Sequence, residues 1–252
     1  MQELKDKVAL ITGGGYGIGK EIALLFGRQG MKIALAARSE GPLNETRGAV
    51  EKVGAQAIAL RADVSKEADC AQMVDQTVKA FGRVDILVNN AGIAGPTKRT
   101  TEMALAEWQE VLDINLTGAW LASRAAIPAM VKAHSGNILM ISSGAGRRGY
   151  PLRSPYASSK WAMIGLTQTL AGEWGADGIR VNCICPGPIR TAITDRISEE
   201  HKTIYAKRRT ALGRYGDPEE VAHMTLSLCL PAASFLTGAV IAVDGGLMAR
   251  NA

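Results

Sequence analysis

The sequence has few aromatic residues, few cysteines and histidines, and no long apolar run. Aromatic residues make up 5% of the 252 positions, beside four cysteines and three histidines. No apolar stretch reaches the ~18 residues that a membrane-spanning helix needs, and no signal peptide precedes the first apolar segment. We therefore expect no membrane partner.

The cysteines and histidines form no metal-ligand pattern. Cys183 and Cys185 have the wrong spacing for a zinc knuckle, and no histidine is near them in the sequence. Buried free thiols are the expected state of these cysteines, and such thiols are typical of a reducing compartment. We therefore expect a cytoplasmic protein without a metal site.

Basic residues exceed acidic ones, but they do not cluster as in a nucleic-acid-binding protein. The net charge is +5, and the densest basic stretch, residues 190–214, holds seven Lys/Arg and three acids. There is no run of five basic residues and no basic stripe with aromatic platforms, so we expect no nucleic-acid partner. The excess charge is interpreted mainly as solvated surface. An anionic substrate or a cofactor phosphate is the alternative.

Short apolar runs alternate with helical patterns along the chain, and the apolar positions of residues 19–29 recur at helical spacing. Such runs are typical of strands buried on both faces of a parallel sheet. The alternation predicts an α/β, doubly wound, mostly parallel seven-stranded sheet, a Rossmann fold. No linker interrupts residues 1–252, so we expect a single domain. The predicted strands are Val8–Ile11, Lys32–Ala36, Ala57–Leu60, Asp85–Val88, Asn137–Ser142, Arg180–Ile184 and Ala239–Val243.

A glycine-rich turn, Thr12–Gly19, separates the first predicted strand from the first predicted helix. Glycines permit a sharp turn and a close approach of the backbone to a pyrophosphate, which the N–H groups at the helix N-terminus then bind. The turn therefore predicts a dinucleotide site. A purely structural glycine turn is the alternative.

The charge of the residues at the end of the second predicted strand helps to distinguish NAD(H) from NADP(H). A carboxylate there would hold the ribose 2′-hydroxyl of NAD(H), whereas a cation suits the 2′-phosphate of NADP(H). No acid is present; Arg38 can pair with a phosphate through two parallel hydrogen bonds, and Ser39 can add a donor. NADP(H) is therefore preferred. NAD(H) stays open, because Arg38 can equally cover the adenine face as a surface side chain.

Tyr156 and Lys160 are four residues apart in a helix predicted to run through Trp174, so they share one face. A tyrosine with a pKa of about 10 exchanges protons poorly at neutral pH unless a cation stabilises its phenolate. Lys160 can supply that cation. Ser143, which ends the preceding strand, can hold a substrate oxygen.

Together these motifs resemble those of the short-chain dehydrogenase/reductase family over essentially the whole chain. Each motif is modest alone, but their joint order and spacing are highly specific. The matching segments are Thr12–Gly19, Asp63–Val64, Asn89–Gly92, Asn115, Ser143, Tyr156 with Lys160, and Pro186–Thr191.

The resemblance implies a catalytic set of Asn115, Ser143, Tyr156 and Lys160. Tyr156 would be the general acid in reduction and the base in oxidation, Lys160 would hold the nicotinamide ribose and lower the tyrosine pKa, and Ser143 would orient the carbonyl. Asn115, in a predicted helix, would bind a water of the proton relay, or would only satisfy a helix kink. The spacing to Tyr156 selects Ser143 over Ser142, which we expect to be structural because neighbouring strand residues face opposite ways.

The resemblance also implies the cofactor contacts. Asp63 would touch the adenine, Asn90–Gly92 would pack on the adenosine ribose, and Asn89 would brace the sheet. Ile189 and Thr191 would face the nicotinamide carboxamide. The predicted cofactor set is Gly13, Tyr16, Gly17, Ile18, Gly19, Arg38, Ser39, Asp63, Val64, Asn90, Ala91, Gly92, Tyr156, Lys160, Pro186, Gly187, Ile189 and Thr191.

The chain departs from many NADP-dependent relatives at Tyr16, where they carry a basic residue, so phosphate recognition would rest mainly on Arg38. Residues 190–214 fall where the family has a substrate lid. Three arginines follow Ser143 and are expected either to grip a carboxylate or phosphate of the substrate or to lie on the surface or at a subunit contact: Arg147, Arg148 and Arg153. The lid is expected to complete a pocket with Ile93, Ala94, Tyr150, Leu152 and Pro188.

The predicted function is hydride transfer between NADP(H) and a carbonyl or secondary alcohol, with a small molecule such as a ketone, or an acyl thioester such as a 3-oxoacyl thioester, as the substrate. An NAD-dependent dehydrogenase of a polyol, sugar or hydroxy acid is the alternative. A non-catalytic nucleotide sensor on the same fold is the alternative from another class. Residues 238–246 resemble a segment that the family uses in tetramer contacts, and the apolar positions within residues 112–127 are consistent with a helix packed against a partner. These features predict a homotetramer by family resemblance, and ordinary core is the alternative for both segments.

Overall fold

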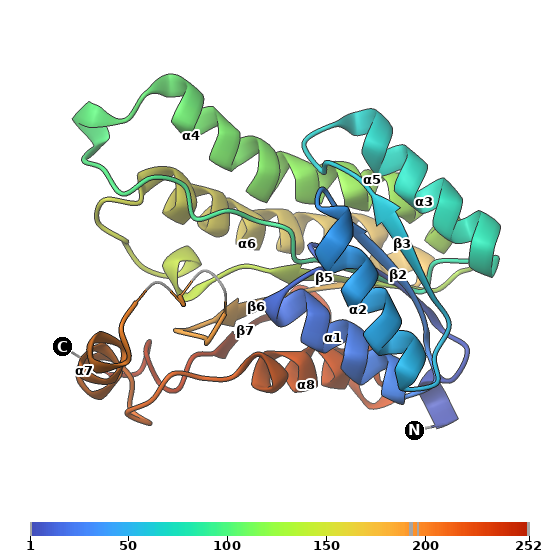
Figure 1. The fold of residues 1–252 in the computed structure, drawn as a ribbon. Helices are drawn as coiled ribbons and strands as arrows, with labels where there is room; N and C mark the ends of the chain where they lie inside the picture. The colour runs from blue at the N-terminus through green and yellow to red at the C-terminus, as the bar shows by residue number, and fades with distance from the viewer. Residues whose placement is uncertain (1, 192–193, 196, 251–252) are drawn as a thin grey trace.

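Seven strands pair in parallel in the order β3–β2–β1–β4–β5–β6–β7. The computed structural model describes residues 2–191, 194–195 and 197–250. The predicted seven-stranded Rossmann sheet is confirmed, and all of its neighbouring strands are parallel (Figure 1). The strands are Val8–Thr12 (β1), Lys32–Ala37 (β2), Ala57–Arg61 (β3), Ile86–Asn89 (β4), Gly136–Ile141 (β5), Ile179–Pro186 (β6) and Val240–Val243 (β7).

Three residues predicted at strand ends lie just outside the strands: Ala239, which precedes β7, and two whose side chains make further contacts. Asp85 precedes β4, where its carboxylate accepts a hydrogen bond from Val8 N at 2.9 Å and pairs with Lys7 at 3.2 Å. Ser142 follows β5, and its hydroxyl donates to the carbonyl of Lys160 at 2.8 Å. Both side chains therefore tie a strand end to a neighbouring element.

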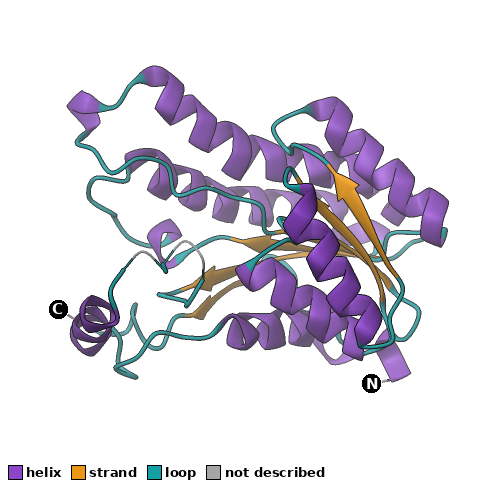
Figure 2. Ribbon diagram, in the orientation of Figure 1, coloured by secondary structure: helices purple, strands orange, loops and turns teal. Residues whose placement is uncertain are grey.

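Helices cover both faces of the sheet (Figure 2). One face is covered by α1, α2 and α8, and the other by α3, α5 and α6, with α4 leading into α5 (Figure 1). Helix α7 lies apart, beyond the carboxyl ends of the strands. The helices are Gly17–Arg28 (α1), Glu40–Lys52 (α2), Glu67–Phe81 (α3), Leu105–Leu112 (α4), Gly118–Lys132 (α5), Ser154–Trp174 (α6), Glu199–Arg209 (α7) and Pro218–Cys229 (α8).

The sheet separates two apolar clusters. Leu10 of β1 packs into the cluster under α3, α5 and α6, whereas its neighbour Ile11 packs into the cluster under α1, α2 and α8. This alternation follows from the two-residue period of a strand, and burial on both faces explains why β1 reads as a continuous apolar run. The four cysteines are buried and free, and Cys183 and Cys185 place their Sγ atoms 4.0 Å apart.

The chain reverses its direction of winding between β1 and β4, which are neighbours in the sheet. From β1 the chain winds outward through β2 and β3, and from β4 it winds the other way through β7. At such a switch point the loops after the two strands separate and leave a crevice at the carboxyl ends. In the described part of the chain, no helix is long and apolar enough to cross a membrane.

Candidate active site

A cleft of about 1290 Å³ runs along the carboxyl ends of the strands, from the end of β2 to α7. It brings together residues that are far apart in the sequence, from Gly13 to Leu247. Every residue of the predicted catalytic and cofactor sets lines it, except Gly19 and Asn115. The predicted site is therefore one continuous surface, and these two residues act from behind it.

The glycine turn after β1 adopts a conformation that side chains would block. Gly13 has φ +66°, and a Cβ atom there would lie 2.9 Å from Ala91 Cα. Gly19 is buried behind the turn, where a Cβ atom would overlap the carbonyl oxygen of Gly13 and the side-chain amide of Asn90. Gly19 therefore packs behind the turn and is absent from the cleft lining, and its contact with the cofactor stays a prediction.

The loop after β4 is locked to this turn by Thr12 and Asn90. The hydroxyl of Thr12 accepts hydrogen bonds from Asn90 N and Ala91 N, both at 3.1 Å. The side-chain amide of Asn90 donates to the carbonyl oxygens of Thr12 and Gly13, at 3.0 and 3.1 Å. Buried hydrogen bonds of this kind fix the two loops relative to each other.

Asn89 is the last residue of β4, and its side chain points toward α5. It is buried, and its side-chain amide donates to the hydroxyl of Ser123 on α5 at 3.0 Å. It is absent from the cleft lining. The geometry agrees with the bracing role expected for it.

The end of the cleft that lies next to β2 combines a cation, a hydroxyl and a carboxylate. Arg38 and Ser39 follow β2 and are exposed, and Ser39 precedes α2 without a side-chain capping hydrogen bond. Burial acts to raise the pKa of Asp63, but hydrogen bonds from Ser65 and the charge of Arg38 hold it below its ordinary value. Asp63 is therefore ionised, and Ser39 keeps its hydroxyl available.

Tyr156 and Lys160 face the cleft from the first turns of α6. The ammonium of Lys160 lies 5.9 Å from the centre of the Tyr156 ring and donates to the carbonyl of Ile141 at 2.8 Å. Burial lowers the pKa of Lys160 to about 8. Burial also raises the pKa of Tyr156, while a hydrogen bond with Ser143 acts in the opposite direction. The pair is therefore a half-buried phenol near a buried ammonium.

Ser142 and Ser143 follow β5 and both line the cleft, but their hydroxyls have different partners. The hydroxyl of Ser143 lines the cleft beside Tyr156 and accepts a hydrogen bond from Ala145 N at 3.1 Å. Ser142 is buried, and its hydroxyl is engaged by the carbonyl of Lys160. The geometry agrees with the structural role expected for Ser142.

Asn115 occupies a π-helical turn, Asp113–Thr117, between α4 and α5. Its side chain is fully buried, accepts from Ile93 N at 2.8 Å, and donates to Ile93 O at 3.0 Å and to Ser159 Oγ at 3.1 Å. Single π-helical turns are frequent at functional sites. Here the turn aims the amide at the loop after β4 and at α6, so Asn115 holds together two walls of the cleft.

Helix α7, within the predicted lid, lines the end of the cleft opposite Arg38, where the substrate is expected. Residues 192, 193 and 196 of that lid lie outside the described part of the chain. The predicted lining of Ile93, Ala94, Tyr150 and Pro188 is present, but Leu152 is absent from it. Leu152 has φ +65° and is exposed. With this left-handed backbone its side chain lies outside the cleft lining, so the expectation for Leu152 was wrong.

Sequence reasoning missed the side chains that α7 contributes to the cleft. They are His201, Ile204, Tyr205, Arg208 and Arg209. Spacings of three and four residues place them on one helical face, and this signal was present in the sequence. Tyr215, which packs edge-on against Tyr205 with ring centres 6.1 Å apart, had no such signal.

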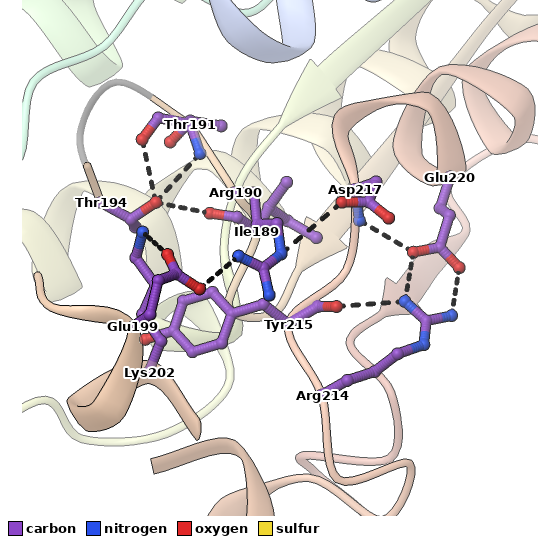
Figure 3. Close-up of polar contacts among 10 residues, drawn as sticks. All are labelled: Ile189, Arg190, Thr191, Thr194, Glu199, Lys202, Arg214, Tyr215, Asp217 and Glu220. Atoms are coloured by element: carbon purple, nitrogen blue, oxygen red, sulfur yellow. Dashed lines mark hydrogen bonds and ion pairs between the residues drawn. The ribbon is translucent and has the colours of Figure 1, made fainter. Parts of the chain in front are cut away.

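Ion pairs anchor the first turn of α7 (Figure 3). Glu199 accepts from Arg190 and from Lys202, both at 2.8 Å, and Arg190 also lies 3.8 Å from Asp217. Hydrogen bonds from Arg190 and Lys202 lower the pKa of Glu199 to about 2. The start of α7 is thus attached to the loop that follows β6 and to the start of α8.

Of the three arginines after Ser143, two have defined partners. Arg153 donates to the carbonyl oxygens of Ala94 and Gly95, at 3.0 and 2.7 Å. Arg148 donates to the hydroxyl of Tyr205 at 3.3 Å and lines the cleft. Arg147 is exposed and is absent from the lining.

The fold and this site define an oxidoreductase that uses a nicotinamide cofactor. The chain belongs to the short-chain dehydrogenase/reductase family. A sequence profile of the family described as "Enoyl-(Acyl carrier protein) reductase" matches residues 13–248.

Individual relatives agree over nearly the whole chain. The chain is 38% identical to the 3-oxoacyl-[acyl-carrier-protein] reductase of Synechocystis, covering 98% of this chain and 99% of that protein. It is 37% identical to the 2-(S)-hydroxypropyl-CoM dehydrogenase 3 of Xanthobacter autotrophicus, covering 98% of each. It is 36% identical to the glucose 1-dehydrogenase 2 of Bacillus subtilis, covering 98% and 96%.

Solved structures show the same fold. Levodione reductase superposes with a TM-score of 0.94 at 33% identity, covering 98% of this chain and 99% of that one. A short-chain type dehydrogenase/reductase from Mycobacterium marinum superposes with a TM-score of 0.93 at 35% identity, covering 98% of each chain.

Proposed function

We propose that this protein is an NADP(H)-dependent oxidoreductase that interconverts a carbonyl compound and a secondary alcohol. The observation that carries the proposal is the meeting of Ser143, Tyr156 and Lys160 in one cleft, beside the glycine turn after β1. A ring hydroxyl next to a buried ammonium suits proton exchange with a substrate oxygen.

The residues of the cleft fit a nicotinamide cofactor. The buried ammonium of Lys160 has three donors, and the described residues offer it Ile141 O and the weakly accepting Met163 Sδ, at 2.8 and 3.6 Å. The remaining donor suits a ribose hydroxyl. A Cβ atom on Gly92 would fill the space 3.5 Å from this ammonium, so glycine keeps that space open.

The protein's own residues then manage the proton and the substrate oxygen. The bound nicotinamide supplies or accepts the hydride. In reduction, Tyr156 donates its phenolic proton to the substrate oxygen, and in oxidation the phenolate takes it back. Lys160 favours the phenolate by its charge, and Ser143 donates a hydrogen bond that fixes the substrate oxygen.

Asn115 acts as a positioning residue in this proposal. Its side chain holds Ile93 in the loop after β4 and binds Ser159 in the first turns of α6. Ser159 Oγ in turn donates to Tyr156 O at 2.8 Å. The water-binding role implied by the family stays a prediction.

The preference for NADP(H) is supported by Arg38 and by the absence of an acid at the end of β2. The sequence there is Ala36-Ala37-Arg38-Ser39. The first acid after it, Glu40, starts α2 and faces Arg61 at 3.8 Å, and neither side chain lines the cleft. Arg38 therefore provides the charge for a 2′-phosphate, and Tyr16 adds none.

Three variants test the cofactor preference. Ala37→Asp places a carboxylate beside the 2′-phosphate and should shift the ratio of kcat/KM toward NADH, and Arg38→Gln should weaken NADPH more than NADH. Arg61→Gln is the matched control, because it removes an exposed charge from the neighbouring strand end outside the cleft. Equal preference in wild type and in all three variants would overturn the assignment to NADP(H).

A panel of ketones, 3-oxoacyl thioesters, sugars, polyols and hydroxy acids, assayed with NADPH and NADH, tests the reaction itself. We expect turnover of a ketone or 3-oxoacyl thioester with NADPH. Turnover confined to a sugar, polyol or hydroxy acid with NAD would favour the alternative dehydrogenase. Cofactor binding without any turnover would favour a nucleotide sensor.

We also propose a cytoplasmic homotetramer. Support for assembly comes from β7, which is a half-exposed edge strand, and from Phe235 beside it, whose ring is fully exposed. The apolar positions of α5 support it less, because Leu121, Ala126 and Ile127 pack into the core. Light scattering of the purified protein tests this, and a monomeric mass would contradict it.

A further inference from the structure

The substrate end of the cleft carries positive charge with no negative charge beside it. Arg148, Arg208 and Arg209 line this end. Among the described residues of the lining, Asp63 is the one carboxylate, and it lies at the opposite end next to Arg38. A cleft lined by one sign of charge concentrates ligands of the other sign.

The acids of the lid do not compensate this charge. Glu199 is engaged by Arg190 and Lys202 at the first turn of α7 (Figure 3). The other two acids of the lid, Asp195 and Glu200, are exposed and absent from the cleft lining. Arg208 and Arg209 lie in the last turn of α7. Within the described ranges of the chain, neither Arg208 nor Arg209 forms an ion pair. Their guanidinium groups are therefore available to a ligand.

Arg148 joins these cations from the other wall of the cleft. Its guanidinium donates to Tyr205 on α7 at 3.3 Å, and its carbonyl accepts from the Trp161 indole at 3.3 Å. Its Nε atom is buried and has no hydrogen-bond partner among the residues that the structure describes. A buried donor without a partner is costly, and a ligand oxygen would satisfy it.

The other two arginines of the same loop do not belong to this group. Arg153 is committed to the carbonyl oxygens of Ala94 and Gly95 and so shapes the cleft wall. Arg147 is exposed outside the lining. The cationic group therefore consists of one loop residue and one face of α7, and it is not a general feature of a basic surface.

We propose that Arg148, Arg208 and Arg209 form a subsite for an anionic group of the substrate, so that the preferred carbonyl substrate carries a carboxylate, sulfonate or phosphate remote from the reacting carbonyl. Guanidinium groups recognise all three anions through paired hydrogen bonds. The inference rests on the proposed function, and it names the substrate class of that same site.

The same chemistry can come from a free organic anion or from the phosphate of a phosphopantetheine thioester, and a test separates the two. Four ketones are compared with saturating NADPH: a methyl ketone with a terminal carboxylate, its sulfonate analogue, its neutral methyl ester, and a 3-oxoacyl phosphopantetheine thioester. The readout is the ratio of kcat/KM for each anionic ketone to that for the neutral ester, at low and high salt.

We expect wild type to favour at least one anionic ketone about tenfold or more, and added salt to reduce this ratio. Arg208→Gln with Arg209→Gln, and separately Arg148→Gln, should lower the ratio by about tenfold to a hundredfold. Lys207→Gln is the matched control, since it removes an equal charge from α7 one residue outside the lining, and it should keep the ratio. A preference for the thioester alone would assign the subsite to phosphopantetheine.

Equal kcat/KM values for anionic and neutral ketones in wild type would overturn the subsite and leave the proposed function intact. An unchanged ratio in both arginine variants would do the same. Turnover of no carbonyl compound, despite measurable NADPH binding, would instead remove the proposed function and the subsite with it.

Discussion

At one end of the cleft, the walls are short loops held by partly buried hydrogen bonds, and at the other end they are long charged side chains on one helix. Thr12 and Asn90 join the loops after β1 and β4 through four hydrogen bonds between 3.0 and 3.1 Å. Helix α7, in contrast, is held at its first turn by ion pairs of the exposed Glu199, one with the exposed Arg190 and one with the buried Lys202. Exposed ion pairs contribute little to stability, because water and salt screen them.

This difference separates the chemistry from the choice of substrate. The cofactor end leaves little freedom to its residues, since a single added carbon on Gly13 or Gly19 meets backbone or side-chain atoms. The substrate end tolerates change, because its side chains reach into the cleft from an exposed helix face. We therefore expect substitutions at the two ends of the cleft to change different measured properties, and by different amounts.

The largest effect is expected at the proton-exchanging residue. Tyr156→Phe removes the phenolic proton and should lower kcat by about a hundredfold to ten-thousandfold, with NADPH affinity retained. Tyr150→Phe is the comparison variant, because its ring centre lies 6.3 Å from that of Tyr156. Steady-state kinetics and cofactor titration measure both. A Tyr156→Phe protein as active as wild type would remove this residue from the mechanism.

A smaller effect is expected from filling the space behind the glycine turn. Gly19→Ala should lower the free energy of unfolding by about 1–3 kcal/mol through overpacking against Gly13 and Asn90, and should weaken NADPH binding. Gly165→Ala on the exposed face of α6 has no atom within 4 Å of the added carbon and should stabilise the protein by about 0.4–1 kcal/mol. Thermal or denaturant unfolding checks the pair, and equal changes would contradict the turn's tight packing.

The buried lysine should give the fold a pH dependence. Its pKa is 10.5 in the ordinary state and about 8 in the fold, so between these values the unfolded chain binds more protons than the native one. The free energy of unfolding therefore rises with pH across that window, by on the order of 3 kcal/mol at most from this group. This gain in the free energy of unfolding is complete above pH 10.5, the ordinary pKa of lysine, and it is lost as the pH falls through about 8, the pKa in the fold.

Lys160→Met isolates this contribution in the cofactor-free protein. The difference in unfolding free energy, wild type minus variant, should rise from pH 8 to pH 10.5 and stay flat below pH 7. Denaturant titrations at several pH values measure the slope of this difference. A difference independent of pH would show that Lys160 keeps its ordinary pKa in the fold.

The smallest effect is expected at the anchor of α7. Arg190→Gln removes the partner of Glu199 and Asp217, and because both contacts are exposed, the unfolding midpoint should hardly change. The KM for the substrate should rise more than the affinity for NADPH falls, since the lid borders the substrate end. Arg61→Gln, which loses an exposed ion pair with Glu40 outside the cleft, is the matched control. Equal KM values in the two variants would contradict a lid role.

Much of the sheet could be predicted because its strands are buried on both faces. Residues such as Leu10 and Ile11 read as one apolar run, and the parallel order follows from the alternation with helices. Tyr156 and Lys160 could be paired from their four-residue spacing on a helix. The role of each, however, came from the family resemblance.

What the sequence did not reveal depends on contacts between distant segments. The π-helical turn at Asn115 directs its amide to Ile93, which is 22 residues away, and to Ser159 on α6. Gly19 is needed because Asn90 lies behind the turn, and no local pattern shows that approach. The cations of α7 were visible as charge, but which of them face the cleft depends on how the helix docks.

The most direct test of the account follows the hydride itself. Reduced cofactor deuterated at its transferable position is incubated with a ketone and with wild type or Tyr156→Phe, and the alcohol is analysed by mass spectrometry. The account predicts that the deuterium appears on the carbinol carbon with wild type and that the variant forms this product far more slowly. An alcohol without deuterium, or no alcohol at all from any carbonyl compound in the presence of bound cofactor, would contradict it.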